Sequence, residues 1–214
     1  IPIGSKVVVL LPSWPNIPAI QSIMSAKLEL IPISMKDGKW NLNLDQVFDA
    51  CDSNTSAIVI NSPNNPSGWT MSNEEQKELL EFSRQRGIWI VSDEVYARIH
   101  FKSNHAPSFC EIMEQDDRVV VINSFSKSWA MTGWRLGWIT ASAKLEVQFE
   151  KLTEYNVAGP PPFVQQAGIT AICEGEEFIR ESNKRYQKAL SYFKEWSESQ
   201  ERIEFVTPDA AFYA

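Results

Sequence analysis

Short, continuous apolar runs recur along most of the chain. Six of them occupy residues 7–12, 28–33, 57–62, 88–93, 119–125 and 135–141. Apolar runs of this length, without polar residues in alternation, are typical of strands that are buried on both faces. The pattern therefore predicts six buried strands.

Helical periodicity fills several of the gaps between these runs. One predicted helix extends from Ser72 to Arg86, where Ser72 and Glu75 have the spacing of a capping box and Gly87 provides a stop. Strands that alternate with helices need crossover connections, which favour a mostly parallel sheet covered on both sides. We therefore expect an α/β fold of three layers, α/β/α, with its ligand at the carboxyl ends of the strands.

The pattern changes after residue 141. Helices are predicted at 143–155, 163–174 and 176–197, and the segment RIEFVTP at 202–208 is predicted to be a strand. We expect a large domain at residues 1–194 and the beginning of a small α+β C-terminal domain at 195–214. Because Ile1 begins mid-sequence without an initiator methionine, we expect a fragment that lacks part of both domains.

Composition narrows the class of partner. The 214 residues are 43% hydrophobic and 22% charged, which suffices for one sizeable core. A net charge of -7 without a basic block disfavours nucleic acid, and no apolar run reaches the roughly 18 residues of a membrane span. Three widely spaced cysteines favour free thiols in a reducing compartment. We expect a cytoplasmic protein with a small-molecule partner.

Polar residues collect where three predicted strands end. The segments INSPNNPSG at 60–68, VSDEVY at 91–96 and NSFSK at 123–127 all follow apolar runs directly. One chemistry would use them together: a lysine forms a Schiff base with an aldehyde cofactor, an acid pairs with its pyridinium nitrogen, and donors hold a phosphate. A lysine taken in isolation is more often a surface residue, so Lys127 needs the support of its motif.

Other motifs give no support for a nucleotide or metal site. No GxGxxG follows a predicted strand and no Walker lysine motif occurs, so nicotinamide and nucleoside triphosphate sites lack support. His100 and His105 do not have the spacing of metal ligands, and we expect them to be structural or surface residues.

The segments NSPNNPSG, SDEVY and SFSKSWAMTGWRLGW carry a resemblance to a known family. In this order they resemble the large domain of the class I/II aminotransferases, the aspartate aminotransferase-like enzymes of fold-type I. The resemblance covers nearly the whole chain, and the lysine motif with an arginine eight residues later is specific. It implies pyridoxal 5'-phosphate as cofactor, amino acid and 2-oxo acid substrates, and a homodimer.

The resemblance also implies roles for individual residues. Lys127 would form the Schiff base with the cofactor and move the proton at the substrate α carbon. Asp93 resembles the carboxylate that pairs with the pyridine nitrogen, although an aspartate at this place is also a common helix cap. Tyr96 and Asn65 resemble the two donors to the phenolic oxygen, and Asn65 has turn chemistry as its alternative.

Three further residues resemble cofactor ligands. Ser124 and Arg135 correspond to phosphate ligands, with a strand-end hydroxyl and a surface arginine as the structural alternatives. Trp14 corresponds to the aromatic ring that stacks on the cofactor, and its alternative is a core or interface tryptophan.

The residues leave three functions open. A transaminase is the first hypothesis. A carbon-sulfur β-lyase is the second, because the same scaffold can expel a β substituent, and a ligand-sensing domain of an aminotransferase-like transcription regulator is the third. The glycine-rich phosphate loop and the arginine that binds the substrate carboxylate are expected upstream of Ile1 and downstream of Ala214.

Overall fold

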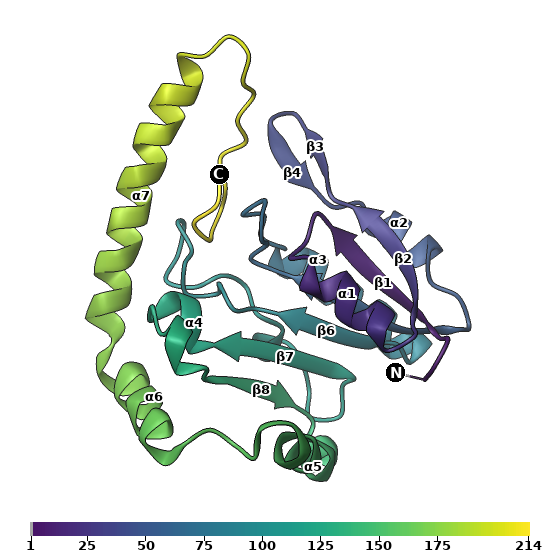
Figure 1. Cartoon of the computed structure of the whole chain (residues 1–214). Coiled ribbons are helices and arrows are strands. Elements are labelled where there is room, and N and C mark those ends of the chain that lie inside the picture. The colour runs from purple at the N-terminus through teal and green to yellow at the C-terminus, as the bar shows by residue number, and fades with distance from the viewer. Residues whose placement is uncertain (1) are drawn as a thin grey trace.

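A six-stranded sheet forms the centre of the computed structural model, which describes residues 2–214 (Figure 1). Its strands lie in the order β2-β1-β5-β6-β7-β8, and all neighbours are parallel except β7 and β8. The six predicted strands are confirmed to within two residues: β1 (Lys6–Leu11), β2 (Lys27–Pro32), β5 (Thr55–Asn61), β6 (Trp89–Asp93), β7 (Val119–Ser124) and β8 (Gly137–Ala141).

Helices cover both faces of this sheet. Side chains alternate along a strand, so Val8 of β1 faces the helices α2 (Leu44–Asp49) and α3 (Asn73–Arg86), in the larger core cluster. Val7 faces the opposite side and packs in a second cluster with Ile17 of α1 (Asn16–Ile23). The expected three-layer α/β/α arrangement is confirmed.

The two edge strands differ from the prediction of full burial. Most residues of β2 and β8 are exposed or half-buried, and Leu30 and Ile139 keep 45% and 48% of their surface accessible. An apolar run indicates a strand, but it does not indicate whether that strand has neighbouring strands on both sides. The prediction of full burial was therefore wrong for these two edge strands.

Local sequence signals set the bounds of α3. The Ser72 hydroxyl accepts a hydrogen bond from the Glu75 backbone N–H at 3.2 Å, and the Glu75 carboxylate accepts one from the Ser72 N–H at 2.7 Å. Gly87 follows the helix in the left-handed region with φ 66°. The capping box and the glycine stop are therefore confirmed.

The elements that the periodicity did not predict are short. They are α1, α2, α4 (Phe125–Ser128), the 3-10 helices at Phe109–Glu111 and Thr132–Trp134, and a hairpin of β3 (Ser34–Lys36) and β4 (Lys39–Asn41). The hairpin turns at Asp37 and Gly38, both at positive φ, as its two-residue connection requires.

The predicted C-terminal helices are confirmed, but the predicted strand at 202–208 is wrong. The helices are α5 (Glu146–Val157), α6 (Pro162–Glu174) and α7 (Glu176–Glu198). The C-terminal segment, residues 199–214, turns back from the end of α7 toward the sheet (Figure 1). Its strand-like contact is a single bridge between Ala210 and His100, because residues 201–204 are exposed and lack a neighbouring strand. Since α7 continues across residue 195, the domain division there stays a prediction.

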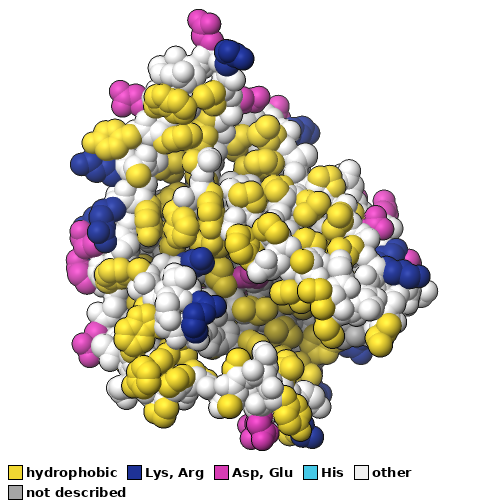
Figure 2. Space-filling view, viewed as in Figure 1, with side chains coloured by type: hydrophobic (Ala, Val, Ile, Leu, Met, Phe, Trp, Pro, Cys, Tyr) yellow, Lys and Arg dark blue, Asp and Glu magenta, His cyan; other side chains and the backbone are white. Residues whose placement is uncertain are grey.

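Among residues 2–214, none of the helices combines the length and the apolar character that a membrane crossing requires. The exposed hydrophobic residues are instead scattered over several elements, including α1, β8, α5 and α6. Large hydrophobic areas are visible on the face shown in Figure 2.

Gly68 fixes the C-terminal segment to the sheet. Its φ is 67°, and its carbonyl oxygen accepts hydrogen bonds from the Asp209 and Ala210 N–H groups at 3.0 and 3.1 Å. A Cβ atom at this position would lie 2.3 Å from the Pro208 Cβ and 2.8 Å from the Ala210 oxygen. A side chain at residue 68 would therefore push the segment away.

We expect Gly68→Ala to destabilise the full-length protein by about 2–4 kcal/mol, through left-handed strain and overpacking together. Gly38→Ala is the matched control, because Gly38 has φ 70° with nothing within 4 Å of an added Cβ. It should cost only the strain, about 1–2 kcal/mol. Urea unfolding measures both, and equal losses in the two variants would contradict the crowding at Gly68.

Candidate active site

A cavity of about 280 Å³ lies at the carboxyl ends of β5, β6 and β7. Near the middle of the face in Figure 2, basic and acidic side chains meet between hydrophobic areas. The structure brings all seven candidate residues to the lining of this cavity: Trp14, Asn65, Asp93, Tyr96, Ser124, Lys127 and Arg135. Asn61, Val95, Ser126, Thr132 and Tyr213 complete the lining.

A larger hollow of about 680 Å³ lies between β8 and α5. Its titratable side chains are the glutamates Glu146, Glu150 and Glu154. It does not combine a base with an acid, so the smaller cavity is the better candidate for chemistry.

Lys127 lies in α4 (Phe125–Ser128), the short helix that follows β7 directly. The Ser124 hydroxyl caps this helix by accepting a hydrogen bond from the Ser126 N–H at 3.0 Å. The Nζ of Lys127 lies 5.7 Å from the centre of the Tyr96 ring, and no hydrogen bond or ion pair holds it among residues 2–214. The cavity therefore contains an amine that none of these residues engages in a hydrogen bond or an ion pair.

Asp93 is the last residue of β6, and its carboxylate accepts a hydrogen bond from the Val95 N–H at 3.2 Å. Burial raises the pKa of this carboxyl to about 6, although the Val95 N–H and the charge of Lys127 act in the opposite direction. A half-buried carboxylate with one such donor retains the capacity to accept a charged donor from a ligand.

Tyr96 is buried, and its hydroxyl lies 2.7 Å from the hydroxyl of Tyr213. The Asn65 side-chain amide donates to the same Tyr213 oxygen at 3.1 Å. Burial, followed by the contact with Tyr213, raises the pKa of Tyr96, so its hydroxyl stays protonated. The three side chains form a network of polar hydrogens at one wall of the cavity.

The turn that carries Asn65 is held against the end of β6. The Asn61 side-chain oxygen accepts from the Asn65 N–H at 2.7 Å, and its amide donates to the Asp93 carbonyl oxygen at 3.2 Å. Asn61 and Asp93 are also register partners between β5 and β6. Asn61 therefore places Asn65 and Asp93 at the same cavity.

Ser124, the last residue of β7, and Arg135, in the segment between β7 and β8, also line the cavity. Arg135 has φ 54°, and its Nη1 donates to the Thr132 carbonyl oxygen at 2.8 Å, which leaves other guanidinium N–H groups available. Besides capping α4, the Ser124 hydroxyl donates a long hydrogen bond of 3.4 Å to the Leu136 oxygen. Trp14 lies in the loop after β1 and keeps 48% of its surface exposed.

The loop after β6 is anchored on the far side of the strand from the cavity. Glu94 is buried, and its carboxylate accepts hydrogen bonds from the Ser92 hydroxyl at 3.0 Å, the Ser108 hydroxyl at 2.5 Å and the Phe109 N–H at 3.1 Å. Burial raises the pKa of Glu94, since these donors offset only part of its desolvation. The network fixes the backbone on which Asp93 and Tyr96 lie.

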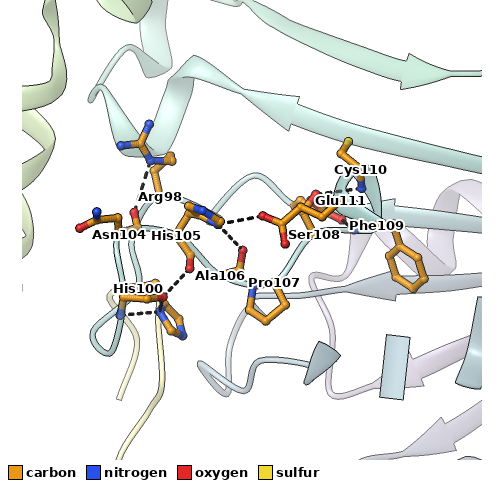
Figure 3. A network of polar contacts seen from close by, with 12 residues as sticks. Arg98, His100, Asn104, His105, Ala106, Pro107, Ser108, Phe109, Cys110 and Glu111 are labelled. Carbon is orange, nitrogen blue, oxygen red and sulfur yellow. Dashed lines mark hydrogen bonds and ion pairs between the residues drawn. The ribbon is translucent and has the colours of Figure 1, made fainter. Parts of the chain in front are cut away.

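The two histidines belong to this loop (Figure 3). The Nδ1 of His100 accepts from the Ser103 N–H at 3.1 Å, and the Nδ1 of His105 lies 3.0 Å from the Ala106 oxygen and 3.5 Å from the Glu111 carboxylate. Within the described chain, no group of three or more His, Cys, Asp or Glu side chains is placed to hold a metal ion.

Sequence reasoning missed Tyr213 and Asn61. Tyr213 is 117 residues from Tyr96 along the chain, and a contact of that separation leaves no periodic signal. Asn61 ends the apolar run that precedes Asn65, and this polar residue at a strand end was the available signal.

Comparisons with known proteins agree with this geometry. The family model for aminotransferases of class I and II matches residues 1–214. The aspartate aminotransferase of Thermococcus kodakarensis is 31% identical over 98% of this chain and 54% of its own length. The arginine–pyruvate transaminase of Pseudomonas aeruginosa is 32% identical over 79% of this chain and 42% of its own length.

A solved aminotransferase structure has the same fold as this chain. The aromatic aminotransferase of Pyrococcus horikoshii superposes with a TM-score of 0.90 at 27% identity, over 99% of this chain and 57% of that one. This chain spans about half the length of the curated relatives described here. Enzymes of this family use pyridoxal phosphate. Because the family model matches its whole length, the chain belongs to the aminotransferases of class I and II.

Proposed function

We propose that the full-length protein is a pyridoxal phosphate-dependent aminotransferase that moves an amino group between an amino acid and a 2-oxo acid. The observation that carries this proposal is the cavity itself, in which an unpaired lysine amine shares one lining with the half-buried carboxylate of Asp93. The family membership and the named relatives, all aminotransferases, support the same reaction.

The donor set fits this cofactor. The free Nζ of Lys127 suits an aldehyde carbon, the single-donor carboxylate of Asp93 suits a protonated ring nitrogen, and the hydrogens of Tyr96 and Asn65 suit an anionic oxygen. Ser124 and Arg135 offer a hydroxyl and a planar fork to a phosphate. Trp14 would lie against the flat face of the ring.

When it is bound, pyridoxal phosphate supplies an aldehyde that takes up amino groups and a ring that withdraws electrons from the carbon bearing them. Lys127 would hold the cofactor covalently through Nζ in the resting enzyme. Once displaced by the substrate amine, its Nζ would take the proton from the substrate α carbon and deliver it to the cofactor. Asp93 would keep a proton on the ring nitrogen, and Tyr96 with Asn65 would stabilise negative charge on the ring oxygen.

Mixing the loaded full-length protein with a panel of amino acids tests the reaction. We expect at least one amino acid to convert the cofactor to its amine form and to release the matching 2-oxo acid. No conversion with any member of the panel would contradict the proposal. Release of pyruvate and ammonia from cystathionine, without a 2-oxo acid acceptor, would instead indicate the β-lyase. A helix-turn-helix upstream of residue 1 would indicate the transcription regulator. The comparisons with known proteins favour neither alternative.

The assembly and compartment are part of the same proposal. We infer a homodimer, as the resemblance to the family implies, and a cytoplasmic location. Cys51, Cys110 and Cys173 are free thiols, which supports a reducing compartment. Sedimentation analysis of the full-length protein tests the dimer, and a fully active monomer would contradict it.

Arg135→Lys tests the phosphate contact. Lysine keeps the positive charge but loses the planar fork, so we expect the Kd for pyridoxal phosphate to rise about tenfold. Arg135→Gln also removes the charge and should weaken binding further. Fluorescence titration of the cofactor-free protein measures the three constants, and an unchanged Kd in both variants would remove Arg135 from the phosphate site.

A further inference from the structure

We propose that Tyr213 is a positioning residue of the cavity, whose hydroxyl orients the Tyr96 hydroxyl and the Asn65 amide toward the cofactor oxygen. This inference rests on the proposed function, because Tyr96 and Asn65 would contact that oxygen directly. It assigns a role in the site to the C-terminal segment, which enters the cavity through Tyr213.

The contacts of Tyr213 join three distant parts of the chain. Its hydroxyl oxygen lies 2.7 Å from that of Tyr96, in the loop after β6, and accepts from Asn65, in the turn after β5, at 3.1 Å. The Tyr96 hydroxyl and the Asn65 amide both contact this one oxygen of Tyr213. Tyr213 is therefore the shared partner of the two donors.

Counting hydrogens gives the direction of this network. A tyrosine hydroxyl has one hydrogen and two lone pairs, and Tyr213 uses one lone pair to accept from Asn65. Its hydrogen can then be donated to Tyr96, which leaves the Tyr96 hydrogen free to point into the cavity. An anionic oxygen in the cavity favours this arrangement, and hydrogen bonds in series strengthen one another.

The backbone holds Tyr213 in this position. Ala211 donates its N–H to the Ile99 oxygen at 2.8 Å, and Asp209 donates to the Gly68 oxygen at 3.0 Å. The Tyr96 ring packs edge-on against Phe212 and Tyr213, with centroid distances of 5.5 and 5.7 Å. These contacts fix the distance between the two hydroxyl groups before any ligand binds.

The test is Tyr213→Phe in the full-length protein loaded with pyridoxal phosphate, read from the pH titration of the cofactor's visible absorption. Weaker donation to the anionic oxygen should raise the titration midpoint by about 0.5–1 pH unit, the shift expected for the loss of one hydrogen bond. Tyr186→Phe is the matched control. Tyr186 lies in the same aromatic cluster, and its hydroxyl has no hydrogen-bond partner within residues 2–214, so its midpoint should not move.

A double variant separates positioning from a general structural effect. If Tyr213 acts partly through Tyr96, replacing Tyr213 in a Tyr96→Phe background should shift the midpoint less than in the wild-type protein. An unchanged midpoint in Tyr213→Phe, or shifts that add fully, would overturn the inference and leave the proposed function intact. A wild-type protein that shows no cofactor absorption band would overturn both.

Discussion

Lys127→Ala is expected to reduce the transamination rate of the full-length protein by about 10⁴-fold or more. The variant loses the amine that would hold the cofactor and the base that would move the proton at the α carbon, and a positioned base alone contributes about 10²–10⁴-fold. Stopped-flow measurement of the half-reaction with the best amino acid of the panel gives the rate.

Lys144→Ala is the matched control for this prediction. Lys144 is exposed, and its amine pairs with Asp116 at the surface at 2.7 Å. Because exposed ion pairs contribute little, this variant should keep the wild-type rate. A Lys127→Ala protein that is folded and retains more than about a tenth of the rate would show that another group moves the proton.

Asp93→Asn is expected to have opposite effects on activity and on the stability of the cofactor-free protein. Asparagine has the shape of aspartate without its charge, so it cannot hold a proton on the cofactor's ring nitrogen. We expect the rate to fall about 10²–10³-fold, the size typical of losing one strong electrostatic contact in an active site.

The stability effect follows from the pKa of Asp93. Burial raises this pKa from 3.8 to about 6, so the folded protein binds the proton more tightly than the unfolded chain does. The stabilisation is complete below pH 3.8 and is lost as the pH rises through 6. At neutral pH the ionised carboxylate therefore costs the cofactor-free protein on the order of 1–3 kcal/mol, and asparagine removes this cost.

Urea unfolding of the cofactor-free, full-length protein at two pH values measures this effect. The gain in Asp93→Asn should be roughly twice as large at pH 8 as at pH 5, because Asp93 is largely protonated in the folded protein at pH 5. A gain that does not depend on pH, or a loss of stability at pH 8, would contradict the burial of a carboxylate at residue 93.

Local chemistry explains why most of the fold was predictable. The apolar run before Asp93 and the Ser72–Glu75 capping box each determine an element from its own residues. The position of a strand at the edge of the sheet depends on the other strands and not on its own residues. The exposure of β2 and β8 was therefore not predicted. The segment at 202–208 alternates like a strand but has no strand beside it, and α7 separates it from the sheet along the chain.

The candidate site was predictable to the extent that it lies at strand ends. Lys127 and Asn65 follow strands of the sheet and Asp93 ends one. These three strands, β5, β6 and β7, are parallel, so topology alone places the three residues at the same edge. Tyr213 reaches the cavity through the return of the C-terminal segment. That return depends on Gly68 and on contacts between residues more than a hundred positions apart, which no local pattern encodes.

Covalent capture of the cofactor tests the central claim most directly. The full-length protein is loaded with pyridoxal phosphate, reduced with borohydride and digested with trypsin. Trypsin cleaves after lysine and arginine, so a pyridoxyl group on Lys127 should block one cut and leave residues 119–135 as a single modified peptide. That modified peptide is the result we predict. A folded, loaded protein whose 119–127 peptide is released unmodified, with the adduct on another lysine or on none, would contradict the assignment of Lys127.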